Sequence, residues 1–290
     1  LHGVAVAAGR ASVWGMDELQ DTLELDGVQA PSIEEARSQN QLILVAEDDK
    51  TNQRVIMRQL SMLGYAAELA VDGVQALALW EKGSYACLLT DLHMPKMDGY
   101  ALTKKVRESE GPDVHIPILL LTANALSGEA EKARSIGVDE YLTKPLQLKI
   151  LSDALDRWVP RENVDLALVG REDGQNIDAM NFDLNVLSIA IGGDRSIINE
   201  VLAEYLDSTL KLRKELFTAG LDGEAQRVGS LAHRLKGSSQ IVGAMRLGAL
   251  CAELEHASKS ADYTVVRQFI SKIELEWEKV AVDIREAIAA

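Results

Sequence analysis

The sequence of 290 residues has few aromatic residues, few cysteines and a deficit of positive charge. Aromatic side chains make up only 4% of the residues, so aliphatic side chains must fill the hydrophobic cores. Cys87 and Cys251 are too few for a disulfide scaffold or a structural zinc site, and we expect them to be reduced, buried thiols. Lys and Arg total 30 against 45 Asp and Glu, a formal net charge of −15. This balance argues against direct binding to nucleic acid or to an anionic membrane, since both are negatively charged.

Long hydrophobic runs are also missing. No apolar stretch approaches the ~18–20 residues that a membrane-spanning helix needs. The first residues, from Leu1, have no basic segment before their apolar part, so they do not resemble a signal peptide. We expect a cytoplasmic protein without a membrane segment of its own, cut from a longer polypeptide.

The pattern along the chain divides it into four zones. At roughly 100–200 residues per domain, this length predicts two domains. We interpret residues 1–40 as the tail of a preceding domain and a linker, 41–160 as an α/β domain, 161–180 as a polar linker and 181–290 as an all-helical domain.

The first predicted domain alternates strands with helices. Five apolar runs alternate with amphipathic segments, which predicts a doubly wound α/β fold with a five-stranded parallel sheet. The runs lack polar alternation, as is typical of strands buried on both faces. The predicted strands are 42–46, 66–70, 86–90, 118–122 and 140–142, and the predicted helices are 51–63, 72–82, 100–109, 128–136 and 146–158.

The second predicted domain shows only helical periodicity. Four long amphipathic segments are separated by short breaks, which predicts an up-and-down helical bundle. The predicted helices are 197–216, 224–241, 245–258 and 263–288.

Charged and hydroxyl side chains follow several of the predicted strands. Glu47 and Asp48 follow the first strand, Asp91 the third, Thr122 ends the fourth, and Lys144 follows the fifth. The carboxyl ends of parallel strands meet at one edge of a sheet, where such folds bind their ligands. Clustered carboxylates repel each other unless a cation neutralises them, and Mg²⁺ prefers such oxygen ligands. One carboxylate could then attack a phosphoryl group, whose oxygens the hydroxyl and the ammonium would hold.

One histidine of the helical domain stands on a polar helix face. At 100° per residue, His233 lies roughly 150° from the centre of the apolar stripe, so we expect it to face solvent. Lys236 lies about one turn further on and could help to neutralise a phosphoryl group. Small and polar neighbours on this face predict the close approach of a large partner. These predicted docking residues are Gly229, Ser230, Gly237 and Gln240.

Four motifs of residues 41–160 resemble the receiver domain of two-component signalling. They are Glu47-Asp48-Asp49, the segment Asp91-Leu92-His93-Met94-Pro95, Thr122-Ala123 and Lys144-Pro145. The resemblance implies that Asp91 is the phosphoacceptor and that Thr122 and Lys144 hold the phosphoryl oxygens. It implies that Tyr141 is an aromatic switch that moves with Thr122, and that the Lys144–Pro145 bond is cis. The implied Mg²⁺ site comprises Glu47, Asp48, Asp91 and the main-chain carbonyl of His93.

A phosphatase of the haloacid dehalogenase type is the closest rival for this domain. It also uses a strand-end aspartate with Mg²⁺, but it needs a second acid two residues after the nucleophile. Here that position is His93, which disfavours the phosphatase.

The segment Ala232-His233-Arg234-Leu235-Lys236-Gly237 resembles the histidine phosphotransfer (HPt) domain. So do Val242-Gly243-Ala244 and Cys251-x-x-Leu254-Glu255. By this resemblance His233 is the phosphoacceptor of the second domain.

A receiver followed by an HPt domain resembles the C-terminal part of a hybrid (unorthodox) sensor histidine kinase. The implied route runs from an upstream phosphohistidine, in a kinase domain of the same polypeptide, to Asp91, then to His233 and to a downstream response regulator. The sequence contains no Gly-rich nucleotide loop, so we expect phosphotransfer without ATP-dependent kinase activity in this chain. Two alternatives stay open: a phosphate sink, in which Asp91 drains His233 by hydrolysis, and a regulatory binding module without net transfer.

Overall fold

A computed structural model describes residues 30–111, 114–122, 135–159, 181–260 and 263–290. The predictions for residues 1–29, for the linker 161–180 and for most of the helix at 128–136 lie outside these ranges. No helix within the described ranges has both the length and the apolar character needed to cross a membrane.

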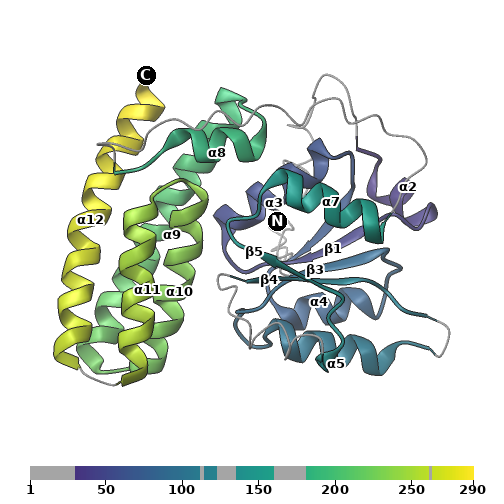
Figure 1. The fold of residues 1–290 in the computed structure, drawn as a ribbon, viewed down its shortest axis with the longest axis horizontal. Helices are drawn as coiled ribbons and strands as arrows, with labels where there is room; N and C mark the ends of the chain where they lie inside the picture. Colours follow the sequence, from purple (N-terminus) through teal and green to yellow (C-terminus); the bar gives the residue numbers. More distant parts are fainter. Residues whose placement is uncertain (1–29, 112–113, 123–134, 160–180, 261–262) are drawn as a thin grey trace, which may run out of the picture.

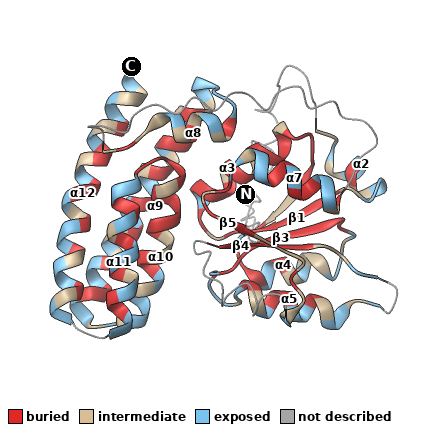
Figure 2. Cartoon of the chain, viewed as in Figure 1, coloured by how far each residue is buried: buried red, intermediate tan, exposed pale blue. Residues whose placement is uncertain are grey.

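A five-stranded parallel sheet forms the centre of the first domain, as predicted (Figure 1). Its strand order is β2-β1-β3-β4-β5, and all neighbouring strands are parallel. Three of the five strands are buried throughout, so they appear red in Figure 2. The order reverses between β1 and β3, which places the ligand crevice of the fold at their carboxyl ends. The strands are β1 (Ile43–Ala46), β2 (Ala67–Ala70), β3 (Cys87–Asp91), β4 (Ile118–Thr122) and β5 (Glu140–Thr143).

Helices cover both faces of this sheet. On one face, α3 (Lys50–Met62) and α7 (Leu148–Trp158) contribute to one hydrophobic cluster. On the other, α4 (Gly73–Trp80) and α5 (Gly99–Ser109) contribute to a second cluster. A short helix, α2 (Ile33–Ser38), adds the fully buried Ala36 to the second cluster. The packed part of the domain therefore begins before the predicted boundary at residue 41.

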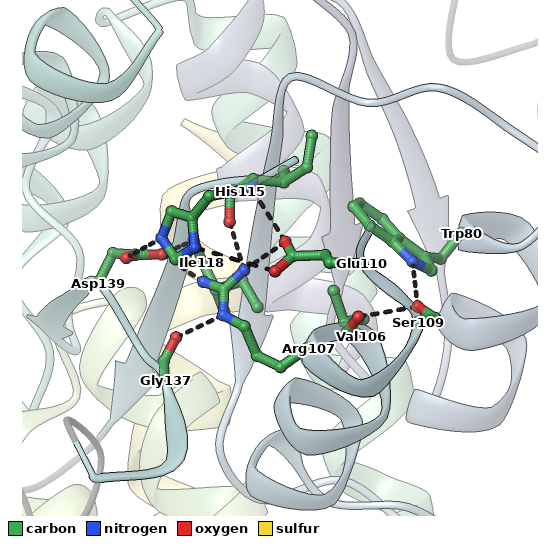
Figure 3. A network of polar contacts seen from close by, with 10 residues as sticks. Trp80, Val106, Arg107, Ser109, Glu110, His115, Ile118, Gly137 and Asp139 are labelled. Carbon is green, nitrogen blue, oxygen red and sulfur yellow. Dashed lines mark hydrogen bonds and ion pairs between the residues drawn. The ribbon is translucent and has the colours of Figure 1, made fainter. Parts of the chain in front are cut away.

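A polar network ties the loops at the amino ends of β4 and β5 (Figure 3). The Arg107 guanidinium donates hydrogen bonds to the carbonyl of Gly137 at 2.9 Å and to the carboxylates of Glu110 and Asp139, both at 2.5 Å. The His115 ring lies 2.7 Å from Asp139. This network lies at the edge of the sheet opposite the strand ends that carry the predicted site, and we assign it a structural role.

Helices alone make up the described part of the second domain, as predicted. The bundle helices are α9 (Arg195–Asp222), α10 (Ala225–Ile241), α11 (Met245–Ser260) and α12 (Tyr263–Ala289). The predicted break at 219–223 is shorter in the structure, because α9 continues to Asp222 and ends at Gly223 with a left-handed backbone (φ 72°). A fifth helix, α8 (Leu184–Ile191), was not predicted.

Helix α3 of the α/β domain lies against the bundle. Helix α3 contacts α8, α9 and α10, and the bundle stands beside the α/β domain in Figure 1. Val55 of α3 is 2% exposed and belongs to the hydrophobic cluster of the bundle. The two domains are thus docked through α3.

Candidate functional site

Three carboxylates meet at the carboxyl ends of β1 and β3. Glu47 and Asp48 directly follow β1, and Asp91 is the last residue of β3. One oxygen from each lies within 4.8 Å of the others. Asp49, the next residue, accepts a hydrogen bond from the backbone N–H of Asn52 and caps α3, so it is turned toward the helix. We call Glu47, Asp48 and Asp91 the acidic cluster.

Lys144 reaches this cluster from the end of β5. Its ammonium lies 2.6 Å from Glu47 Oε2 and 2.9 Å from Asp91 Oδ2. The Lys144–Pro145 bond is cis, as the receiver resemblance implied. The side chain of Lys144 is 5% exposed, so the structure places it inside the crevice rather than on the surface.

Burial and charge act in opposite directions on these groups. Burial raises the pKa of Glu47, because the carboxylate loses hydration, and Lys144 opposes this rise. Burial also raises the pKa of Asp48, to about 6, although Arg234 limits the rise. For Lys144, burial alone would lower the pKa, but Asp91 and Glu47 outweigh it and raise the pKa. The carboxylates therefore hold Lys144 in its charged form.

Two buried carboxylate oxygens of the acidic cluster accept no hydrogen bond. Asp91 Oδ1 is one, and Asp48 Oδ2 is the other. Buried carboxylate oxygens normally have a partner, and oxygen atoms are the ligands that Mg²⁺ prefers. The donor set therefore fits a divalent cation.

The other residues expected at this site also lie along the strand ends. Thr122 ends β4 and is 1% exposed. Tyr141 lies in β5 and packs against a small cluster that includes Leu92 and Leu120. His93, two residues after Asp91, has an exposed side chain that points toward the bundle, where its ring meets His233.

The imidazole of His233 is hydrogen-bonded to the carboxylate of Glu255. Its Nδ1 lies 3.2 Å from Glu255 Oε1 on α11, and the other oxygen of Glu255 accepts a hydrogen bond from Lys236 at 2.7 Å. Although burial alone would raise the pKa of Glu255, the hydrogen bonds from His233 and Lys236 lower it to about 2. The ionised carboxylate only accepts hydrogen bonds, so Nδ1 carries a proton. In the neutral ring, Nε2 is then the nitrogen with the free lone pair.

The expectation that His233 faces solvent is wrong. Its side chain is 12% exposed, and its ring centroid lies 4.2 Å from that of His93. The helix face was assigned correctly, but the other domain of the same chain covers it. The two predicted phosphoacceptors therefore lie on surfaces that face each other.

Charged pairs surround this contact. Arg54 of α3 lies 3.3 Å from Glu200 and 3.7 Å from Glu204 of α9. In the contact with α10 the charges are reversed: Arg234 of α10 reaches into the crevice, where its Nε lies 2.8 Å from Asp48 Oδ2. The α/β domain thus contributes the basic side chain to the ion pairs with α9 and the acidic side chain to the ion pair with α10.

The four predicted docking residues lie in different surroundings. Gly237 faces α3: a Cβ atom there would lie 3.5 Å from Asn52 Nδ2. Gly229 faces α11 instead, since a Cβ would lie 2.5 Å from Ser258 Oγ. The side chain of Gln240 packs on Gly248 of α11. Ser230 is exposed.

Sequence reasoning missed two residues of the site, Glu255 and Arg234. Glu255 belonged to a recognised motif, yet nothing in the sequence showed that it pairs with His233. Arg234 directly follows His233, but its partner Asp48 is supplied by the other domain. A helical wheel predicts which residues share one face of a helix, but it does not predict which other element that face contacts.

Comparison with known proteins agrees with this geometry. Residues 43–156 match the response regulator receiver domain family, and residues 200–285 match the Hpt domain family. Sensor protein EvgS of Escherichia coli K12 is 33% identical over 220 residues, which cover 76% of this chain and 17% of EvgS. Sensor histidine kinase RcsC of the same organism is 37% identical over 133 residues, which cover 45% of this chain and 14% of RcsC.

A solved structure is similar to the first domain. The receiver domain of sensor histidine kinase PA1611 from Pseudomonas aeruginosa, which has a magnesium ion coordinated in its active site cleft, is 39% identical. The match covers 42% of this chain and 99% of that structure, with a TM-score of 0.39.

The chain therefore belongs to the two-component signalling proteins and contains a receiver domain followed by an Hpt domain, the domain pair of a phosphorelay. It is similar to hybrid sensor histidine kinases and spans less than a fifth of the length of EvgS or RcsC.

Proposed function

We propose that this chain passes a phosphoryl group from an upstream phosphohistidine to Asp91, from Asp91 to His233, and from His233 to a separate response regulator. The observation that carries the proposal is the contact between the two domains, which sets the ring of His233 against His93, two residues from Asp91. The donor would be a kinase domain of the same polypeptide. The two free cysteines are buried, which agrees with a relay in the reducing cytoplasm.

Asp91 is the first acceptor in this proposal. Its carboxylate would attack the phosphorus of the incoming phosphohistidine, and the P–N bond would break as the P–O bond forms. Lys144, already 2.9 Å from Asp91 Oδ2, would hold a phosphoryl oxygen, and the Thr122 hydroxyl would hold another. Tyr141 would change its side-chain position when Thr122 moves toward the phosphoryl group. It lies in β5, next to the strand that ends in Thr122.

Mg²⁺ is the cofactor that we propose for this site. Asp48, Asp91 and the main-chain carbonyl of His93 would be its direct ligands. Glu47 would contribute negative charge without contacting the ion directly. When bound, the ion would neutralise charge on the phosphoryl oxygens during transfer. Asp91 Oδ1 and Asp48 Oδ2, which are buried and accept no hydrogen bond, support this assignment.

His233 is the second acceptor. Its Nε2 lone pair would attack phosphorus, the P–O bond to Asp91 would break, and Asp91 would leave as a carboxylate. Glu255 would keep the proton on Nδ1 and stabilise the positive charge that develops on the ring. Lys236 would hold Glu255 in place through their hydrogen bond, in addition to the help in neutralising a phosphoryl group that the sequence predicts.

The order of the relay can be tested with acetyl phosphate as the donor. A receiver can take a phosphoryl group from an acyl phosphate, because its carboxylates and Lys144 can hold a cation and the phosphoryl oxygens, whereas the described part of the bundle has no such carboxylate cluster of its own. We expect wild-type chain to acquire both an acid-stable aspartyl label and a base-stable histidyl label. Asp91→Ala should lose both labels, and His233→Gln should lose only the second. A histidyl label in Asp91→Ala would contradict the proposed order.

A further inference from the structure

Arg234 contributes a positive charge from the Hpt domain to the acidic cluster of the receiver. Its Nε lies 2.8 Å from Asp48 Oδ2, and the Asp48 side chain is only 4% exposed. Although these two atoms are close, neither makes a hydrogen bond, because the N–H group does not point at the oxygen. The contact is therefore an ion pair of poor hydrogen-bond geometry. Such a contact neutralises charge without fixing the guanidinium in one position.

The charges around the cluster favour the binding of a cation. Three carboxylates face two basic side chains, Lys144 and Arg234, which leaves a formal net charge of −1. If a divalent cation took the place of Arg234, the formal net charge would be zero. With Arg234 still present, the cation would make the cluster positive, and it would also meet the guanidinium at Asp48 Oδ2.

We propose that Arg234 is an exchangeable counterion of the acidic cluster, so that the docked Arg234 side chain and a divalent cation compete for Asp48. The Arg234 side chain is 31% exposed and can move to solvent when the cation binds, whereas Lys144 is 5% exposed and stays. The coupling acts in both directions: docking of Arg234 weakens cation binding, and cation binding weakens the hold of the receiver on α10. This inference rests on the proposed Mg²⁺ site.

Calorimetric titration of the full chain with MgCl₂ at constant ionic strength tests the competition. Arg234→Gln removes the guanidinium and keeps a long polar side chain. We expect this variant to bind Mg²⁺ at least about fivefold more tightly than wild type, the lower end of ordinary coupling between sites. Arg227→Gln is the matched control, because Arg227 lies on the same helix and pairs with Glu224, away from the receiver.

The outcomes of this titration test the competition by Arg234 separately from the Mg²⁺ site itself. Tighter binding in Arg234→Gln with wild-type binding in Arg227→Gln supports the competition. Equal affinity in all three proteins overturns it and leaves the Mg²⁺ site intact, and an equal gain in both variants shows a general effect of net charge and overturns it as well. If none of the proteins binds Mg²⁺, the metal assignment itself fails. Circular dichroism of both variants checks that the helix content of the chain is unchanged.

Discussion

At the scale of single residues, the chemistry of the Hpt domain depends on an ion pair behind the nucleophile. Glu255 touches both His233 and Lys236, so one carboxylate orients the ring and restrains the neighbouring ammonium. It does not face the incoming phosphoryl group. We therefore regard Glu255 as a positioning residue whose effect reaches the reaction through Nδ1 of His233.

The change Glu255→Gln tests this role. Glutamine keeps the shape and one acceptor oxygen, but it loses the charge that stabilises the ring as it becomes positive. A charge-assisted hydrogen bond contributes about 1–2 kcal/mol more than a neutral one, so we expect the histidyl label to form roughly tenfold more slowly. The aspartyl label should form at the wild-type rate.

Glu253→Gln provides the control for this prediction. Glu253 lies on the same helix and is exposed, and its substitution removes the same charge. It should transfer at the wild-type rate. The positioning role is wrong if Glu255→Gln matches this control, or if it slows labelling of Asp91 equally.

At the scale of elements, α10 approaches α3 closely because Gly237 has no side chain. Outside the adjoining part of its own helix, the nearest atom to a Cβ at this position is Asn52 Nδ2, at 3.5 Å. Alanine would therefore fit, whereas a longer side chain would meet α3. Gly229 has a different reason to be glycine, because a Cβ there would lie against α11.

Gly237→Gln should separate docking from folding. Glycine within a helix costs about 1 kcal/mol relative to a good helix former, so the bundle should keep or slightly gain stability. Transfer from Asp91 to His233 should slow at least about tenfold, because the added side chain holds α10 away from α3. Gly237→Ala should remain near wild type. Thermal unfolding and the rate of histidyl labelling are the measurements.

Ala252→Gln on the exposed face of α11 is the matched control for this change. It adds the same side chain to the same bundle, away from α3, and should transfer at the wild-type rate. Unimpaired transfer in a folded Gly237→Gln would show that the reaction does not use the α3–α10 contact.

Much of the α/β fold could be predicted, because its signals are local. Three strands are apolar runs that end in or directly precede a polar motif, so these runs could be recognised in the sequence. The predicted strand 118–122 matches β4, and each of the others differs by one residue at one end or both. Helix α8 could not be predicted in this way. Its sequence is apolar almost all round: Leu187 and Ile191 are buried, while Ile189 is 64% exposed. Only packing against α3 and α9 distinguishes these residues.

At the scale of the whole molecule, the two active surfaces belong to one chain and are already docked. Val55 of α3 lies in the core cluster of the bundle, and Arg58 donates a hydrogen bond to the carbonyl of Ile191 at the end of α8. Arg54 and Lys50 pair with acids of α9 around this contact. The receiver is thus a built-in partner of the Hpt domain, which disfavours a binding module without transfer.

The central claim is that the phosphoryl group moves from Asp91 to His233 inside one docked chain. The most direct test measures the rate at which wild-type chain acquires histidyl label from acetyl phosphate over a 100-fold range of protein concentration. Transfer within a docked chain requires no encounter, so we predict a rate per chain that does not change on dilution. A mixture of Asp91→Ala and His233→Gln, which must transfer between chains, should label more slowly and should lose rate on dilution. A wild-type rate per chain that falls in proportion to dilution would contradict the account.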